Sequence, residues 1–305
     1  MFAGIGAQAK AFENLGVPFE HWRVCEIDKY AIESYNAVHG TDFEVSDICK
    51  LHGSDMGVTD TDKYCYVMTY SFPCQDLSNA GYKRGMGREN GTRSGLLWQV
   101  ERILKEMDEK PQILLMENVP QVISKDNIDD FREWIMSLIE MGYTSEYALL
   151  NAKDYGIPQN RERCYMVSWQ GEHTYDFPEP TPLTKSFADY MEREVDERYY
   201  LDDHTCEIND NHYRRHKALG HGFGWEPLPL PDSYTHTHTH THGDAPKLYS
   251  QKLTDKVHPY TSRCLCIGRV LRPGIECSNR IYSPFGLAPT VTCCAGGNRN
   301  IKVDV

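Results

Sequence analysis

The chain has 305 residues and a formal net charge of −12, with 40% hydrophobic and 25% charged residues. These proportions are close to the globular average, which excludes wholesale disorder, and the length permits one large or two ordinary domains. The negative charge argues against nucleic-acid binding across the whole surface, although it is compatible with a local basic cleft.

No apolar run approaches the roughly 20 residues that a membrane span needs. No basic segment followed by an apolar one forms a leader at the start of the chain. The 11 cysteines are too few and too irregularly spaced for a disulfide scaffold. We therefore expect a cytoplasmic protein without a membrane partner, whose cysteines are reduced thiols.

The first half of the chain alternates short apolar runs with amphipathic stretches, which predicts a parallel sheet covered by helices. The expected strands are residues 23–27, 64–70, 113–117, 144–151 and 164–169. The expected helices are residues 7–15, 30–38, 96–107 and 129–141.

A glycine-containing turn, Phe2-Ala3-Gly4-Ile5-Gly6, precedes the first expected helix. Glycines between a strand and a helix let the backbone approach a ligand, with helix N–H groups directed at it. Glycine-rich turns are common, so this turn alone is weak evidence for a binding site.

Two acids continue the same pattern. Glu26 ends the next expected strand, where nucleotide-binding sheets hold ribose hydroxyls. Asp47 lies at the expected end of a third strand and is placed to accept from an adenine amino group. Each acid alone is more often a helix cap or a surface residue, but their ordered series favours contact with a nucleotide-like ligand.

Cys74 lies between Pro73 and Gln75, just after the expected strand 64–70. Most cytosolic cysteines are inert core residues, and that is the interpretation of the other ten. Cys74 differs because Glu117 and Asn118 end the next expected strand, at the same edge of the sheet. A partly desolvated carboxyl there would have a raised pKa and would donate a proton near neutral pH to a ring attacked by the thiolate.

Gln159, Arg161 and Arg163 come just before the last expected strand. Arginines at alternate positions project from one side of an extended segment and suit a phosphate or a carbonyl oxygen. The alternative is an exposed edge held by salt bridges.

Past residue 170 prolines become frequent and helical periodicity fades, which indicates a domain boundary or a large insertion. Residues 235–242 form a strict Thr-His repeat that would place four imidazoles on one face of a strand, as a transition metal requires. We favour the alternative, an exposed loop lengthened by simple-sequence expansion.

Taken in order, these motifs resemble those of the cytosine-C5 DNA methyltransferase family. The matching segments are FxGxG (Phe2, Gly4, Gly6), Glu26-Ile27, Asp47, PCQ followed by Ser78, Gly91–Leu96, ENV (Glu117, Asn118, Val119), QxRxR (Gln159, Arg161, Arg163) and residues 280–292. The resemblance implies an α/β, Rossmann-like class I methyltransferase sheet with helices on both faces. It further implies a catalytic domain over residues 1–168, a smaller irregular target-recognition region over 169–277, and a return segment over 278–305.

The resemblance also implies roles for individual residues. The catalytic set is Cys74, Glu117, Asn118, Arg161 and Arg163. The residues expected to bind S-adenosylmethionine are Phe2, Ala3, Gly4, Gly6, Glu26, Ile27, Asp47, Ile48, Phe72, Pro73 and Leu96. No metal is expected in this chemistry.

The implied reaction is methyl transfer to C5 of a cytosine that is flipped out of double-stranded DNA. Cys74 would attack C6 while Glu117 protonates N3, which makes C5 nucleophilic. Arg163 would contact the O2 edge, Asn118 would brace the Pro73-Cys74 turn, and Gln75 would belong to the loop that closes on DNA. We expect a monomer, and the resemblance leaves room for a cognate restriction endonuclease as a partner.

The chain departs from the family pattern at both ends. Phe2 is the second residue, and the C-terminal GN motif that completes the cofactor pocket is not found, since Gly297-Asn298 directly follows the segment 280–292. Three alternatives therefore stay open. They are a catalytically silent DNA-binding remnant, a cytosine-C5 methyltransferase acting on RNA, and a histidine-rich metal-binding module.

Overall fold

The computed structural model describes residues 1–77, 84–186, 189, 203–220, 235–236, 249–250 and 264–265. These residues belong to two compact units. The first unit contains Met1–Asn151 and Glu162–Pro180, and the second contains Ala152–Arg161 and Thr181–Val305. The segment 280–292 and Gly297-Asn298 lie outside the described residues, so the expectations placed on them stay predictions.

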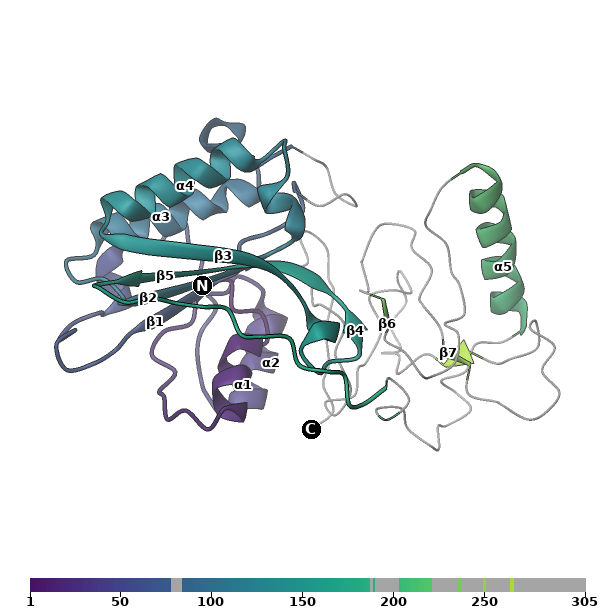
Figure 1. Ribbon diagram of the computed structural model, residues 1–305, viewed down its shortest axis with the longest axis horizontal. Coiled ribbons are helices and arrows are strands. Elements are labelled where there is room, and N and C mark those ends of the chain that lie inside the picture. The colour runs from purple at the N-terminus through teal and green to yellow at the C-terminus, as the bar shows by residue number, and fades with distance from the viewer. Residues whose placement is uncertain are drawn as a thin grey trace. The chain divides into compact units, whose positions relative to one another are not determined.

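A four-stranded sheet forms the centre of the first unit (Figure 1). Its strands run in the order β1 (Val67–Tyr70), β2 (Ile113–Asn118), β5 (Glu162–Gln170) and β3 (Tyr143–Asn151). β1 and β2 pair in parallel, whereas β5 is antiparallel to both β2 and β3. The prediction of a wholly parallel sheet is therefore wrong, because β3 turns back into β5 and inserts it beside β2.

Helices cover both faces of this sheet (Figure 1). On one face lie α3 (Leu97–Glu106) and α4 (Ile128–Glu140), and on the other lie α1 (Ala7–Asn14) and α2 (Lys29–His39). All four were expected within a residue or two of these bounds. Short 3-10 helices occupy several connections: Gly53–Met56, Arg88–Asn90, Ser94–Leu96, Pro120–Ile123 and Ala152–Asp154.

The core lies between the sheet and the pair α3–α4. β2 alternates along its length, so that Leu114, Met116 and Asn118 are buried and the residues between them are partly exposed. Trp134 of α4 is fully buried and donates its indole N–H to the hydroxyl of Tyr70, at 3.0 Å. Burial of such large apolar side chains stabilises the sheet and thereby fixes the edge at which β1 and β2 end.

Residues 23–27 are not a strand, contrary to expectation, and neither is the segment that ends in Asp47. The two segments are extended and are joined by a bond from Ser46 N to Glu26 O of 2.9 Å. A further bond of 3.2 Å connects Ala3 N with Cys25 O. These isolated contacts hold the segments close together without the repeated pairing that defines a ladder.

The described part of the second unit contains β4 (Gln159–Asn160), which pairs in parallel with β6 (Thr235–His236). β7 (Tyr249–Ser250) pairs with β8 (Cys264–Leu265). The first two residues of the Thr-His repeat thus form a short strand, and its remaining residues lie outside the described ones, so the loop interpretation of the repeat stays a prediction.

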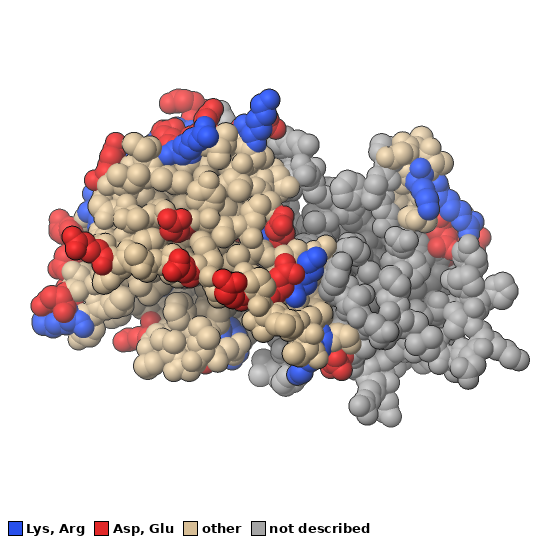
Figure 2. All heavy atoms as spheres, viewed as in Figure 1, with Lys and Arg blue, Asp and Glu red and all other residues tan. Residues whose placement is uncertain are grey.

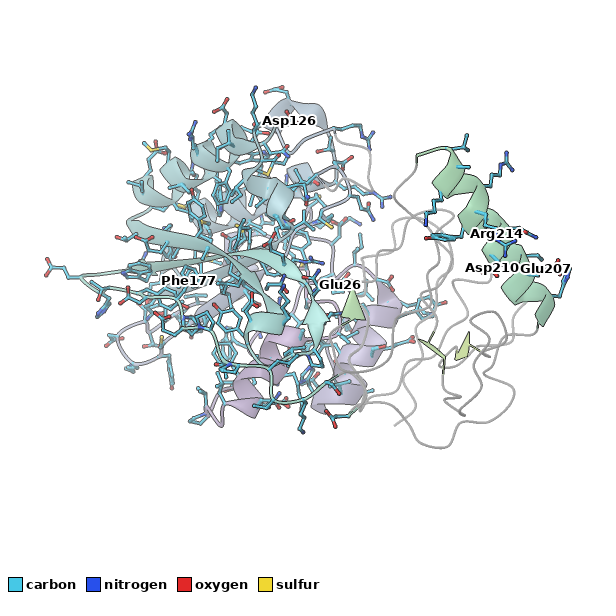
Figure 3. The ribbon with its side chains drawn as sticks, turned by 45° about the vertical axis from the view of Figure 1, so that its right-hand side comes forward. Glu26, Asp126, Phe177, Glu207, Asp210 and Arg214 are labelled. Atoms are coloured by element: carbon cyan, nitrogen blue, oxygen red, sulfur yellow. The ribbon has the colours of Figure 1, made fainter. Side chains whose placement is uncertain are left out.

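The helix α5 (Asp203–Ala218) also belongs to the second unit and was not predicted. It has no apolar stripe, and for this reason hydrophobic periodicity cannot reveal it. Its last turn carries Arg215, His216 and Lys217, which suits the helix dipole. Asp210 and Arg214 approach each other one turn apart, at 3.8 Å (Figure 3).

Across the residues that the structure describes, no helix has both the length and the apolar character needed to cross a membrane. The face shown in Figure 2 carries acidic side chains across the first unit, with basic ones mainly at its margins. This distribution agrees with the formal charge of −12.

Candidate active site

Cys74 lies four residues beyond the end of β1, at the edge of the sheet where the parallel strands finish. Its residue is partly buried, and its carbonyl accepts the N–H of Leu77 at 3.0 Å, which closes a turn. Residues 78–83, which include Ser78 of the expected motif, lie outside the described residues. The thiol is thus carried by a turn at the sheet edge.

Asn118, the last residue of β2, connects this turn to the neighbouring strand. Its buried amide group donates to the carbonyl of Phe72 at 3.0 Å. Its side-chain oxygen accepts the N–H of Val119 at 2.8 Å. Both ends of the amide are therefore engaged, and the segment that leads into Pro73 and Cys74 is fixed relative to β2.

Glu117 and Arg163 form an ion pair of 3.1 Å at the same edge of the sheet. Glu117 pairs with Tyr165 across the β2–β5 ladder, and Arg163 lies two residues from Tyr165. Since residues two apart share one face of a strand, the carboxylate and the guanidinium lie on the same face. Both side chains are largely shielded from solvent, with exposed fractions of 20% and 11%.

The ion pair differs from the arrangement expected for Glu117. The sequence interpretation assumed a carboxyl kept neutral by desolvation. Instead the guanidinium of Arg163 lies beside it, at 3.1 Å, so the surroundings of the carboxyl group are not purely apolar.

Asp76 is a buried acid that sequence reasoning missed, and it organises the turn that carries Cys74. Its carboxylate accepts the backbone N–H groups of Arg93 and Ser94, at 3.0 and 3.3 Å. The hydroxyl of Ser94 in turn donates to the carbonyl of Pro73 at 2.6 Å. These contacts attach the residues on both sides of Cys74 to the turn that precedes α3.

Arg84 approaches Asp76 from the far side of residues 78–83. Its guanidinium donates to the Asp76 carboxylate at 2.9 Å, and Gly85 N donates to Asp76 O at 3.1 Å. Gln75 accepts from Arg93 at 3.0 Å. Asp76 therefore binds the described chain on both sides of residues 78–83, through Arg84 and Gly85 after them and through its own turn before them. An acid two residues after a cysteine gives no periodic signal by which this role could be found.

The glycine turn folds back on itself through a bond from Gly6 N to Ala3 O of 3.0 Å. Phe2, Gly4 and Gly6 all have positive φ, at 56°, 55° and 84°. A Cβ at Gly6 would lie 2.3 Å from His39 Nε2, whereas a Cβ at Gly4 would have no atom within 4 Å. Gly6 is thus required by the packing of α2, and Gly4 leaves open space above the turn.

Glu26 is buried and binds the glycine turn through its carboxylate (Figure 3). One carboxylate oxygen accepts Gly4 N at 2.9 Å. The other accepts Ile27 N at 2.9 Å and Asp28 N at 3.0 Å. The oxygen bonded to Gly4 retains one acceptor position for a further donor, because a carboxylate oxygen has about two lone-pair sites.

The remaining residues expected to bind the cofactor occupy different environments. Ile27 is 65% exposed next to Glu26, whereas Ile48 and Phe72 are buried in the core. The Asp47 carboxylate accepts Cys49 N at 3.0 Å and so begins a turn. Leu96 packs against the core at the end of its 3-10 helix. Contact of these side chains with a cofactor stays a prediction.

Arg161 and Gln159 belong to the second unit, unlike Arg163. Gln159 is buried and starts β4, and Arg161 N donates to Gln159 O at 2.9 Å. Arg161 O accepts Ala152 N at 3.0 Å. The structure therefore places Arg163 beside Glu117, but it does not assign Arg161 to the same group of residues.

We expected every cysteine other than Cys74 to be a core residue. In the first unit this holds for only some of them. Cys25 and Cys164 are buried, and burial raises the pKa of both thiols, that of Cys164 to about 12. Cys49 and Cys65 are exposed, so the assignment of these two to the core is wrong. Cys49 lies in a turn and Cys65 lies just before β1, and the apolar pattern overestimates burial at both positions.

Comparison with known proteins places this geometry in a family. The family model for C-5 cytosine-specific DNA methylases matches residues 1–267. The chain is 33% identical to the Type II methyltransferase M2.ScrFI of Lactococcus lactis subsp. cremoris, over 66% of this chain and 68% of that protein. It is 35% identical to the Type II methyltransferase M.NlaX of Neisseria lactamica, over 74% of this chain and 69% of that protein. The chain thus spans about two thirds of the length of these relatives.

Solved structures agree on the fold. The Entamoeba histolytica methyltransferase EhMeth superposes with a TM-score of 0.67 at 17% identity, covering 87% of this chain and 80% of that chain. The S. pombe Dnmt2 methyltransferase gives a TM-score of 0.59 at 20% identity, covering 85% and 76%. The expected Rossmann-like class I methyltransferase fold is confirmed. The chain belongs to the C-5 cytosine-specific DNA methylase family and is a DNA methyltransferase.

Proposed function

We propose that the chain methylates C5 of a cytosine flipped out of double-stranded DNA, with Cys74 as the nucleophile. The observation that carries this proposal is the Glu117–Arg163 ion pair at the end of β2, next to the turn that Asn118 fixes through Phe72. A carboxyl group and a guanidinium on one face match N3 and O2 on the edge of cytosine. A stacked base cannot reach these groups, and therefore flipping is required.

The reaction begins with the Cys74 thiolate forming a bond to C6 of the ring. The electron pair of the C5–C6 double bond moves toward C5, and Glu117 supplies a proton to N3 that neutralises the charge developing there. Arg163 moves from Glu117 to the O2 atom of the base. After C5 has accepted the methyl group, water takes up the C5 proton, the N3 proton returns to Glu117, and the C6–S bond breaks to release the Cys74 thiolate, which restores the aromatic ring.

S-adenosylmethionine, which methyltransferases of this family use, supplies the methyl group that C5 accepts. The residues around the glycine turn fit such a group. Gly4 leaves open space above its α-carbon, Glu26 keeps an acceptor position for a ribose hydroxyl, and Ile27 exposes an apolar side chain beside it. Gly6, the last residue of this turn, is also the N-cap of α1.

Base methylation in cells tests the proposal directly. DNA from cells that express the full chain should carry 5-methylcytosine at one sequence, and Cys74→Ser should abolish it. Cys65→Ser is the matched control, because Cys65 is exposed and lies just before β1. Equal methylation by the wild type and Cys74→Ser would contradict a nucleophilic Cys74.

An oligonucleotide that contains 5-fluorocytosine tests the covalent step. In the presence of S-adenosylmethionine the wild type should form an adduct that survives denaturation, because fluorine cannot leave as the proton does. DNA binding without an adduct would indicate a silent DNA-binding protein instead. Equal methyl transfer to structured RNA and to duplex DNA would contradict the assignment of duplex DNA as the substrate.

The names of the relatives support a further proposal about partners. M2.ScrFI and M.NlaX are named Type II methyltransferases, a class defined by pairing with restriction endonucleases. We propose that this chain protects the recognition sequence of such a nuclease. DNA methylated by the wild type, but not by Cys74→Ser, should resist one Type II endonuclease of matching specificity.

A further inference from the structure

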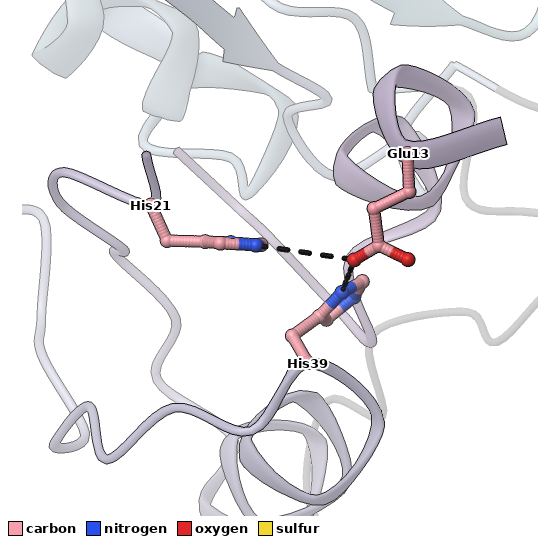
Figure 4. Close-up of side chains that lie close together, drawn as sticks. All are labelled: Glu13, His21 and His39. Carbon is pink, nitrogen blue, oxygen red and sulfur yellow. Dashed lines mark hydrogen bonds and ion pairs between the residues drawn. The ribbon is translucent and has the colours of Figure 1, made fainter. Parts of the chain in front are cut away.

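Glu13, His21 and His39 converge at the side of the glycine turn (Figure 4). Glu13 lies near the end of α1, His39 ends α2, and His21 lies in the connection between these helices. One carboxylate oxygen of Glu13 is 2.8 Å from His39 Nδ1 and 4.0 Å from His21 Nε2. The three candidate ligand atoms all lie within 4.8 Å of one another.

We propose that Glu13, His21 and His39 bind a divalent transition metal ion, with Zn²⁺ as the ion that best suits this set of ligands. Two imidazoles and one carboxylate are a set that binds Zn²⁺ at about 2.0–2.2 Å, with a fourth position for water. Ligand atoms arranged tetrahedrally at that distance lie about 3.3 Å apart. The observed separations of 2.8 and 4.0 Å fall on both sides of this value, so small side-chain rotations would complete the site.

The second nitrogen of each histidine has a partner that would orient it. His39 Nε2 lies 3.2 Å from the carbonyl of Ile5, and His21 Nδ1 lies 2.6 Å from the hydroxyl of Tyr35. Metal-binding histidines usually donate their other N–H to such an oxygen, which fixes the tautomer and the ring plane. With a metal ion bound, each histidine would donate this N–H to its oxygen partner and offer the nitrogen that faces Glu13 to the ion.

Lys10 fixes the orientation of the Glu13 carboxylate. Lys10 binds the other carboxylate oxygen of Glu13, at 2.6 Å, and leaves the first one facing the histidines.

A simple ion pair explains this cluster less well. One histidine suffices to pair with Glu13, yet two imidazoles face the same oxygen, and their ring centroids lie only 5.0 Å apart. A bound ion would also hold the His39 ring against Ile5 and Gly6. The bound ion would therefore stabilise the glycine turn through His39, and it would take no part in methyl transfer.

Direct Zn²⁺ binding tests this proposal independently of catalysis. The full chain should first have His236, His238, His240 and His242 changed to alanine, because the Thr-His repeat would otherwise bind the ion. This four-alanine variant is the background for all further changes. Its titration with Zn²⁺ in competition with a chromophoric chelator gives the number of tight sites. Glu13→Gln and His21→Gln should each remove one tight site or weaken it by at least about 10-fold. Both variants leave His39, the buried member, in place.

His52→Gln is the matched control. His52 also pairs with a carboxylate, that of Glu106 at 3.2 Å, but among the residues that the structure describes it belongs to no such cluster. This variant should bind as much Zn²⁺ as the background. Tyr35→Phe removes the partner of His21 Nδ1 and should weaken the same site about 10-fold. Circular dichroism should show that each variant is folded. Unchanged Zn²⁺ binding in folded Glu13→Gln and His21→Gln, or an equal loss in His52→Gln, would overturn the proposal.

Discussion

Asp76 and Ser94 each bind the backbone N–H of the other through their side chains. Ser94 N donates to the Asp76 carboxylate and Asp76 N donates to the Ser94 hydroxyl, both at 3.3 Å. Both residues are buried, and Cys74 lies two positions before Asp76. This reciprocal exchange resembles a capping box across 18 positions of sequence. It attaches the turn that carries Cys74 to the start of the segment that becomes α3.

Asp76→Asn removes one charge and keeps the shape of the side chain. It weakens the bonds to Arg93 N and Ser94 N and leaves Arg84 without its anion. We expect the free energy of unfolding to fall by about 1–3 kcal/mol, as measured by urea denaturation. In a double-mutant cycle Arg84→Gln should show coupling of at least about 0.5 kcal/mol with Asp76→Asn. Strict additivity of the two changes would show that the ion pair contributes nothing.

Asn118→Ala should lower both stability and activity. It leaves the carbonyl of Phe72 buried without its donor, which costs about 1–3 kcal/mol, and it releases the segment leading to Cys74. The control is Asn127→Ala, because Asn127 is also buried and donates to a carbonyl, that of Gln121 at 2.9 Å. The control should lose similar stability while kcat stays close to that of the wild type. A parallel loss of kcat in both variants would argue against a specific role for Asn118.

Arg163→Gln should mainly reduce kcat for methyl transfer. The variant cannot stabilise charge on the cytosine ring, and losing one such donor costs about 100- to 1,000-fold in kcat. Arg102→Gln is a suitable control, since Arg102 also pairs with a carboxylate, Glu106 at 2.7 Å, but lies on α3. Single-turnover kinetics with duplex DNA would compare the rate of methyl transfer by Arg163→Gln with that by Arg102→Gln. A change confined to KM would place Arg163 in binding rather than in the chemical step.

Glu101 predicts a dependence of stability on pH. Its pKa is lowered to about 2 from an ordinary value of 4.5, chiefly because Arg88 donates to it. A depressed carboxyl pKa means that its contribution is fully present above about pH 4.5 and is lost as the pH falls toward 2. Glu101→Gln removes this partner from Arg88, which is 38% exposed and keeps Glu133, so we expect a screened cost of about 1 kcal/mol at pH 7. The difference between wild type and variant in urea denaturation should shrink steadily below pH 4.5. A constant difference between pH 7 and pH 3 would contradict this assignment.

Gly6→Ala should destabilise the chain by more than its backbone conformation alone explains. Gly6 has a φ of 84°, and an added Cβ would also lie 2.3 Å from His39 Nε2. Gly16→Ala provides the control, because Gly16 also has a positive φ, 67°, with no atom within 4 Å of an added Cβ. We expect the control to cost about 1 kcal/mol and Gly6→Ala clearly more, by thermal denaturation. Equal costs would mean that His39 moves aside without penalty.

Sequence patterns predict the elements that bury a regular face. β2, α3 and α4 were found because apolar residues recur along them at the period of a strand or a helix. Residues 23–27 have a strand-like composition but are held only by isolated hydrogen bonds. Whether such a segment becomes a strand depends on its tertiary contacts, which the sequence pattern does not show. The direction of β5 could not be inferred either, because antiparallel insertion beside β2 depends on how β3 turns back.

The candidate site was predicted where chemistry and motif coincide, and missed where only tertiary structure brings residues together. Cys74, Glu117 and Arg163 were identified from motifs at the ends of strands. Asp76 was not, since its partners Arg93 and Ser94 follow it by 17 and 18 positions in an irregular segment. The same reason hides Glu13, His21 and His39, which three separate segments contribute.

The pairing of β5 between two neighbours makes the position of Arg163 beside Glu117 depend on the alignment of three strands. Nine residue pairs join β5 to β3, and six join it to β2. A shift of β5 by a single position would turn Arg163 to the opposite face of the sheet, away from Glu117. A register shift of β5 that displaced the Arg163 guanidinium would have to break the hydrogen bonds of both ladders at once. The pairing with two neighbours therefore fixes the position of Arg163 firmly.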